Sequence, residues 1–302
     1  MIDEGRIVEA RIHPDGVQRA GSVISARLTS VGSWGRNAVA VDEADLEYLL
    51  PRGAPGVTEG APLTIEVTRE AIPGCEPWKR PLAKLSDASP MDPPSLAGRM
   101  LTFPAARDEL AQAGWNDVMD EARSGLVPFA GGELRISTTP AMTLIDVDGT
   151  LPPEELAVRG AAEAANAVGR LDIGGSIGID LPTVGNKEAR RLAAEAIDEH
   201  LPKPFERTAI NGFGFVQIVR PRHRASLIEL AHDRAPFEAR ALLRRAAFEA
   251  AGPKRLVAHP AVIAVLKARS NWTGALSRQV GGAVELRSDA ALPISGGYAE
   301  KR

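Results

Sequence analysis

The sequence predicts an α/β protein that begins with a β-barrel. Three observations support this fold class. Short strands separated by turn residues fill the N-terminal part, two apolar segments that each end in an aspartate flank an amphipathic helix, and helices alternate with short strands in the last third. With 302 residues, 44% of them apolar, the chain can bury more than one core. We place domain boundaries at residues 1–88, 89–235 and 236–302.

The first domain is expected to be a small antiparallel barrel. Residues 5–70 alternate apolar and polar positions between turns rich in Gly and Pro, without helical periodicity. The expected strands lie at residues 5–12, 21–28, 37–41 and 63–67. A segment rich in Pro and polar residues, 86–94, is expected to be a linker.

The middle of the chain predicts a hairpin followed by a strand–helix–strand unit. Helices are expected at 105–113 and 115–124, a hairpin at 133–137 and 141–146, a helix at 154–170, a strand at 177–180, a helix at 186–201 and a strand at 214–219. The tail predicts a helix at 236–251, a strand at 255–258, a helix from 260 and a strand at 283–287.

Charge is distributed unevenly, although the net charge is only −3. Residues 1–88, 89–200 and 201–302 carry net charges of −3, −9 and +9. An acidic middle beside a basic final third suits a metal site next to a polyanion-binding surface, although helices with charged, solvated faces give the same totals.

Composition also limits the class of protein. Cys75 is the only cysteine, which excludes disulfide pairs and a cysteine-rich zinc site. The N-terminus has no leader pattern, and no apolar run approaches the ~18 residues that a membrane span needs. We therefore expect a soluble, cytoplasmic protein without a membrane partner.

Two aspartates are the strongest candidate site residues. Asp146 ends the apolar segment Thr-Leu-Ile-Asp, and Asp180 ends Ile-Gly-Ile-Asp. Carboxylates at the ends of neighbouring strands repel each other, and a hard cation such as Mg²⁺ relieves that repulsion. The pattern therefore predicts a metal site, with Asp148 as a third carboxylate nearby.

The segment Asp146-Val-Asp-Gly-Thr150 also resembles the nucleophile motif of haloacid-dehalogenase-type phosphatases. That family needs a later acidic pair, usually Asp-Asp or Gly-Asp-x-x-x-Asp, and neither occurs downstream. Its nucleophile strand usually opens the domain, whereas this strand follows a hairpin partner. The phosphatase stays as the less favoured alternative.

The middle segment resembles the ribonuclease E/G family, and the resemblance extends to residues 5–85 and 255–300, so that it covers most of the chain. The matching stretches are Gly-Gly-Glu-Leu-Arg-Ile-Ser-Thr-Thr-Pro-Ala-Met-Thr-Leu-Ile-Asp at 131–146, Leu-Asp-Ile-Gly-Gly-Ser-Ile-Gly-Ile-Asp at 171–180 and Asn-Gly-Phe-Gly-Phe-Val-Gln-Ile at 211–218. The resemblance implies an OB-like RNA-binding barrel, an RNase H-like catalytic domain and a small C-terminal α/β domain. It also implies that Asp146 and Asp180 bind Mg²⁺, with Mn²⁺ as an alternative ion.

The chain departs from this family at three points. Asp148 stands where the family has an Asn, so it is a candidate ligand or a means of recruiting a second ion. The family's Cys-Pro-x-Cys zinc link is absent, so no zinc is expected. Only about forty residues occupy the place of the module that senses a 5′-monophosphate, so a preference for that end is not expected.

Candidate RNA-binding residues follow from the same resemblance and from the charge pattern. Tyr48 matches a family position that stacks bases, whereas Ala40 occupies the other such position. Arg220, Arg222 and Arg224 alternate and would share a face if the strand at 214–219 continued. The further candidates are Trp34, Trp78, Lys79 and Arg207.

Together these features predict a Mg²⁺-dependent endoribonuclease that acts in RNA processing. It would cleave single-stranded RNA to 5′-phosphate and 3′-hydroxyl ends, with Asp146, Asp180 and Asp148 at its centre. The alternative from another class is a non-catalytic RNA-binding protein with a vestigial site. The sequence leaves the RNA target and the oligomeric state open, a homodimer being one arrangement.

Overall fold

The computed structural model describes all residues except 35, 75, 77, 96–97, 100–106 and 302. Cys75 and the start of the helix expected at 105–113 therefore lie outside the described residues. The chain divides into two compact units, Met1–Leu96 with Asn116–Glu229 and Ala97–Trp115 with Leu230–Arg302. Within the described part of the chain, none of the helices combines the length and apolar character needed to cross a membrane.

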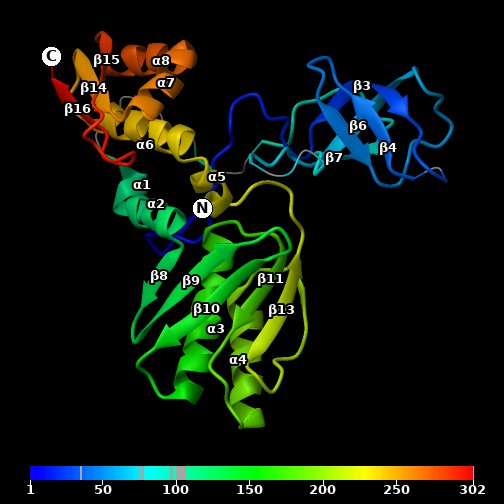
Figure 1. Cartoon of the computed structure of the whole chain (residues 1–302), viewed down its shortest axis with the longest axis vertical. Helices are drawn as coiled ribbons and strands as arrows, with labels where there is room; N and C mark the ends of the chain where they lie inside the picture. The colour runs from blue at the N-terminus through cyan, green and yellow to red at the C-terminus, as the bar shows by residue number, and fades with distance from the viewer. Residues whose placement is uncertain (35, 75, 77, 96–97, 100–106, 302) are drawn as a thin grey trace. The chain divides into compact units, whose positions relative to one another are not determined.

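The N-terminal region contains a closed five-stranded barrel (Figure 1). Its strands follow the order β3-β4-β5-β7-β6 around the barrel, and β5 pairs with β7 in parallel while the other pairs are antiparallel. Alternate side chains fill its core, among them Leu28, Tyr48, Leu50 and Ile65. The strands are β3 (Val23–Ser30), β4 (Ala38–Val41), β5 (Glu47–Leu50), β6 (Pro62–Arg69) and β7 (Leu82–Leu85).

The sequence correctly placed a barrel here, but it assigned one strand wrongly. Residues 5–12 do not form a barrel strand: the chain starts with the short pair β1 (Ile2–Asp3) and β2 (Arg6–Ile7), and the backbone N–H of Ala10 donates to the carbonyl of Arg170. This segment thus packs against the C-terminal end of the helix that ends at Arg170, and its alternating pattern does not mark a barrel strand. The barrel instead uses β5 and β7, two four-residue strands that are not among those expected from the sequence.

The same unit contains a mixed six-stranded sheet in the order β12-β13-β11-β10-β9-β8. Strands β8, β9 and β10 form an antiparallel meander, as expected for the hairpin, and β11 lies parallel to β10 after the crossover helix α3. The strands are β8 (Leu126–Phe129), β9 (Gly132–Thr138), β10 (Thr143–Gly149), β11 (Gly175–Asp180), β12 (Glu206–Arg207) and β13 (Phe215–Arg220). The helices of this unit are α2 (Trp115–Ser124), α3 (Pro153–Arg170), α4 (Lys187–His200) and α5 (Leu227–His232).

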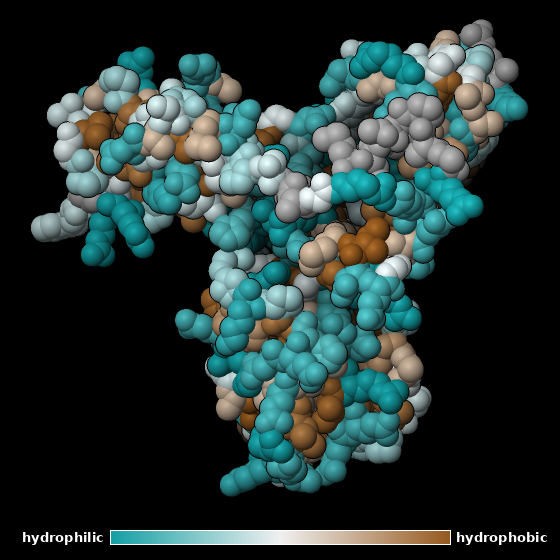
Figure 2. All heavy atoms as spheres, turned by 180° about the vertical axis from the view of Figure 1, so that it is seen from behind, coloured by the Kyte–Doolittle hydropathy of each residue, from teal (hydrophilic) through white to brown (hydrophobic). Residues whose placement is uncertain are grey.

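The two faces of this sheet differ in composition. Ile145, Val147, Ile177 and Ile179 are buried on the face that α3 covers. Gly160 permits this close packing, since a Cβ there would lie 2.3 Å from Cγ1 of Val147. Figure 1 shows α3 and α4 behind the strands of the sheet. Figure 2, which views the molecule from that side, shows a mainly hydrophilic surface with scattered hydrophobic residues. Among the described residues, none of the helices of this unit covers the opposite face of the sheet, on which Leu144 and Val219 are exposed.

The second unit is a small α/β domain. A three-stranded sheet in the order β15-β14-β16 packs with α6, α7 and α8 around Leu242, Leu256, Ile263 and Leu266. Its elements are α1 (Glu109–Gln112), α6 (Arg234–Phe248), β14 (Lys254–Ala258), α7 (Pro260–Ala268), α8 (Ser270–Val280), β15 (Val284–Ser288) and β16 (Tyr298–Lys301). The expected helices and strands of the tail are present, and β16 was missed.

Candidate functional site

The two aspartates singled out in the sequence lie side by side on the uncovered face of the sheet. Strands β10 and β11 are parallel neighbours, and their register pairs Asp146 directly with Asp180. Residues paired in this way point to the same face, about 5 Å apart. The expectation that Asp146 ends its strand is wrong, because β10 continues to Gly149 by pairing with β9. Asp148 therefore also belongs to the strand and lies on the same face as Asp146.

The electrostatic surroundings compensate these carboxylates only in part. Arg135 on β9 lies opposite Asp146, but its guanidinium pairs with Glu133 at 3.2 Å. Among the described residues, no Lys, Arg or His forms an ion pair with Asp146, Asp148 or Asp180. Desolvation, followed by repulsion from Asp148 and Asp180, raises the pKa of Asp146 above its ordinary value, and Arg135 opposes this rise. The site favours a cation.

The donor set fits a hard divalent cation held mainly by two side chains. Carboxylate oxygens suit Mg²⁺, which is usually held by one or two carboxylates and keeps several waters. In the part of the chain that the structure describes, no group of three or more His, Cys, Asp or Glu side chains lies close enough to hold a metal ion. The register thus favours Asp146 and Asp180 as the pair, with Asp148 two residues further along β10.

The sequence missed the residues that surround the pair on the uncovered face. Phe215 on β13 lies opposite Asp180, and its ring covers Gly178, where a Cβ would lie 2.6 Å from Cζ of Phe215. Arg135 could have been found from the hairpin, since the turn at 139–142 fixes its position opposite Asp146. Phe215 could not, because it reaches Asp180 only through sheet pairing across thirty-five residues of chain.

The arginine series at the end of β13 is arranged differently from our expectation. The strand stops at Arg220, so the condition under which Arg220, Arg222 and Arg224 would share a face is not met; Pro221 has no backbone N–H to extend the pairing. Arg220 and Arg224 instead contact Asp172, at 3.7 and 2.8 Å, and Arg222 pairs with Glu229. All three are thus engaged by carboxylates.

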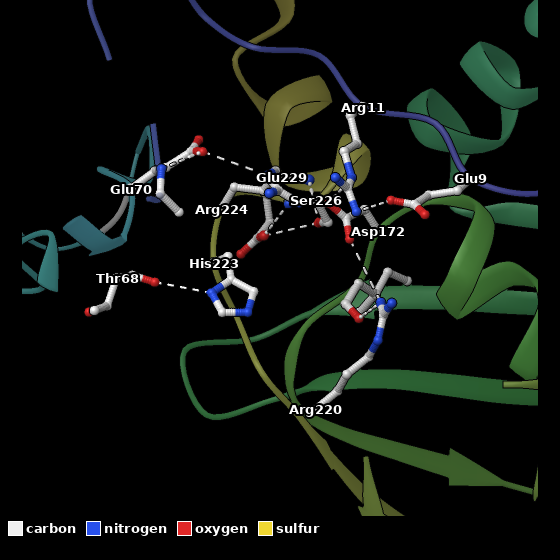
Figure 3. Close-up of polar contacts among 12 residues, drawn as sticks. Glu9, Arg11, Thr68, Glu70, Asp172, Arg220, His223, Arg224, Ser226 and Glu229 are labelled. Atoms are coloured by element: carbon white, nitrogen blue, oxygen red, sulfur yellow. Dashed lines mark hydrogen bonds and ion pairs between the residues drawn. The ribbon is translucent and has the colours of Figure 1, made fainter. Parts of the chain in front are cut away.

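Asp172 is the centre of this cluster, which we call the Asp172 hub. Its carboxylate contacts Arg11 at 3.5 Å as well as Arg220 and Arg224, and it is only 12% exposed. Arg224 also lies 3.6 Å from Glu70 of the barrel (Figure 3). Beside the hub lies a pocket of about 290 Å³ whose lining includes Arg220, Arg222, Arg224, His223 and Lys203.

The other predicted RNA-binding residues lie in varied settings. Tyr48 is 0% exposed in the barrel core and donates its hydroxyl to Asp42 at 3.1 Å, so neither face of its ring is open to a base. Burial raises the pKa of that hydroxyl above its ordinary value. Trp34 and Trp78 are 99% and 71% exposed.

Two basic candidates are already engaged. Lys79 donates to the carbonyl of Pro140 at 3.1 Å and pairs with Glu76. Arg207 pairs with Asp198 of α4, with Nε 2.8 Å from Oδ1, and it lowers the pKa of that carboxyl. Because its strand partner is the buried Ile218, Arg207 faces the helix-covered side, away from the aspartate pair.

Comparison with known proteins gives a partial likeness. No model of a known protein family matches the chain. Ribonuclease G of Salmonella typhimurium (strain SL1344) is 30% identical over 119 residues, and Ribonuclease G of Escherichia coli (strain K12) is 29% identical over the same length. Each match covers 35% of this chain and 24% of the relative. The chain is therefore similar to ribonuclease G over part of its length, and the match spans about a quarter of these relatives.

Proposed function

We propose that this protein is a Mg²⁺-dependent endoribonuclease that cleaves single-stranded RNA to 5′-phosphate and 3′-hydroxyl ends. One observation carries the proposal: Asp146 and Asp180 lie in register on adjacent parallel strands, on an uncovered face, without a cationic partner among the described residues. Two such carboxylates side by side raise the free energy of the folded chain unless a cation joins them. The partial likeness to ribonuclease G supports RNA as the substrate.

In this proposal Asp146 and Asp180 hold the Mg²⁺ ion, and Mn²⁺ is an alternative. When bound, the ion would activate water and neutralise charge that develops on the phosphate. Asp148, on the same face of β10, would orient the ion's water shell or hold a second ion. Arg135, tied to Glu133 at 3.2 Å, would keep positive charge near Asp146 without quenching it.

The architecture supports the proposal at the level of domains. Around the barrel the strands follow their order in the chain, except that β7 lies between β5 and β6. This strand order supports an OB-like RNA-binding barrel. An antiparallel meander that continues through α3 to a parallel strand, with aspartates on the two central strands, supports an RNase H-like catalytic domain. The exposed Trp34 and Trp78 remain the aromatic side chains of the barrel region that we propose contact RNA.

The arrangement of β10 favours a nuclease over the phosphatase alternative. Strand β10 has an antiparallel partner, β9, on one side, and it follows that partner in the chain. The carboxylate nearest to Asp146 across strands is Asp180, which the expected nuclease pair requires. We therefore propose phosphodiester hydrolysis in RNA.

One assay tests the proposed function directly. Labelled single-stranded RNA and p-nitrophenyl phosphate are each incubated with the protein, with Mg²⁺ or with EDTA. We expect internal cleavage of the RNA with Mg²⁺ only, products with 5′-phosphate ends, and no hydrolysis of p-nitrophenyl phosphate. RNA binding without cleavage in either Mg²⁺ or Mn²⁺ would instead identify a binding protein with a vestigial site.

A further inference from the structure

Phe213 is an exposed aromatic side chain two residues before Phe215, the strand partner of Asp180. It lies in the turn that leads into β13, and it is 81% exposed. Single exposed apolar residues are common on protein surfaces, so exposure alone indicates nothing. Phe213 is distinguished by the hydrogen-bonded turn that carries it and by the proximity of that turn to Asp180 in the sheet.

The turn that carries Phe213 is held by a network of hydrogen bonds. The side-chain oxygen of Asn211 accepts from the backbone N–H groups of Phe213 at 2.9 Å and Phe215 at 3.0 Å. The hydroxyl of Thr183 donates to the carbonyl of Phe213 at 3.0 Å. Gly214 has φ +94°, and a Cβ there would lie 2.2 Å from the carbonyl oxygen of Leu181. The backbone at Phe213 is therefore fixed, and only its ring is free.

This turn is fixed to the residues that directly follow Asp180. Leu181 donates its N–H to the carbonyl of Gly214, and Asp180 pairs with Phe215 in the sheet. Paired strands lie ~5 Å apart and two residues of chain span at most ~7 Å, so the Cα atoms of Asp180 and Phe213 lie within about 12 Å. A distance of about 12 Å corresponds to about three nucleotides of a stacked strand, which rises ~3.4 Å per nucleotide.

Electrostatics make a base contact important at this position. Asp146, Asp148 and Asp180 repel phosphate groups, and the neighbouring Arg135 is already paired with Glu133. Contacts to phosphate directly beside these three aspartates are therefore disfavoured. Stacking of bases on aromatic rings is insensitive to the charge of the phosphates and tolerates any base.

We propose that Phe213 is a stacking platform for an RNA base within about three nucleotides of the scissile phosphate. The half-buried ring of Phe215, beside Leu144 over Gly178, extends the apolar surface toward Asp180. The inference rests on the proposed function, because it takes RNA as the substrate. It assigns Phe213 to substrate positioning, with no part in the chemical step.

An abasic scan tests this assignment. Single-stranded RNA oligonucleotides with one cleavage site, each lacking one base near that site, are compared with the intact RNA. In the wild type we expect one abasic position to raise KM without changing kcat. In Phe213→Leu we expect affinity for intact RNA, measured in EDTA, to fall by about 5- to 100-fold, and the penalty at that abasic position to disappear. Phe213→Trp should retain both the affinity and the penalty.

Leu192→Ala is the matched control, because Leu192 is an exposed apolar side chain on α4, and we expect wild-type behaviour from it. Equal affinities and equal abasic profiles in the wild type and Phe213→Leu would overturn the platform. Loss of affinity in Phe213→Leu, in a protein that binds RNA but never cleaves it, would show that Phe213 contacts RNA, but it would contradict both the nuclease and the placement of Phe213 beside a scissile phosphate. Failure of the wild type to bind RNA would contradict both.

Discussion

Aspartates lie near the two ends of β11, and their surroundings are opposite. Asp172, shortly before the strand, has three guanidinium groups within 4 Å, those of Arg11, Arg220 and Arg224. Asp180, its last residue, has no cationic partner among the described residues and pairs with another carboxylate, Asp146. The same residue type thus serves structure at one end and leaves room for an external cation at the other.

The two aspartate settings contribute to the stability of the fold with opposite signs. At the Asp172 hub, opposite charges within the chain satisfy one another, so removal of the carboxylate leaves arginines without a partner. At the aspartate pair, like charges oppose folding, and removal of one carboxylate relieves the fold. Substitutions at the two ends of β11 should therefore have opposite effects on stability.

The largest effect is expected from substitution of the aspartate pair. Asp146→Asn and Asp180→Asn should each lower the rate of RNA cleavage by at least about a hundredfold, because the metal loses a ligand. RNA affinity in EDTA and the circular dichroism spectrum should stay close to those of the wild type. Unchanged cleavage in either variant would remove these residues from the metal site.

The next effect concerns the stability of the Asp172 hub. Asp172→Asn should lower the free energy of unfolding by about 2–3 kcal/mol, somewhat less than a fully buried pair because the carboxylate keeps some contact with water. Urea denaturation measures this loss. Asp198→Asn, which breaks the more exposed pair with Arg207, is the control and should cost less than about 1 kcal/mol. Similar losses in both variants would mean that the hub is an ordinary surface cluster.

A smaller effect is expected at Asp148. If it orients the metal's surroundings, Asp148→Asn should raise the Mg²⁺ concentration needed for half-maximal cleavage by about tenfold while maximal activity remains. Titrations with Mg²⁺ and Mn²⁺, run in parallel, measure this requirement. Overlapping curves for the wild type and the variant with both ions would show that the additional carboxylate is incidental.

The raised pKa of Asp146 predicts a pH dependence of stability in the absence of metal. The folded protein holds this proton more tightly than the unfolded chain does, so stability is lost as pH rises through the folded-state pKa. Asp146→Asn removes the ionising group. Its melting temperature should exceed that of the wild type at about pH 7, and the difference should shrink toward pH 4. A difference that is constant with pH would contradict the raised pKa of Asp146.

The smallest effect tests RNA contact near the hub. Arg222 pairs with Glu229 and does not contact Asp172, so Arg222→Ala leaves the hub's own ion pairs in place. If Arg222 contacts a phosphate, the slope of log affinity against log salt should fall by about 0.7. Fluorescence anisotropy of labelled RNA at several salt concentrations measures the slope. Identical slopes would assign Arg222 to structure alone.

The sequence by itself determined the local units. The turn residues and the period-two pattern placed the hairpin that carries Asp146, and the helical period placed α3 between the two aspartate strands. It also placed a barrel at the N-terminus, because short strands and turns recur there. These features depend on residues close together in the chain, which a periodic pattern records.

Only the tertiary structure decided which side chains meet. It set the register that places Asp146 directly beside Asp180, enclosed Tyr48 in the barrel core, and brought Arg11 and Arg224 to Asp172 from distant parts of the chain. A periodic pattern gives the face of a strand, whereas the neighbour on that face is set by strand register and packing between remote segments. For that reason the sequence identified the carboxylates, and the fold determined which of them pair with arginines and which lack a cationic partner among the described residues.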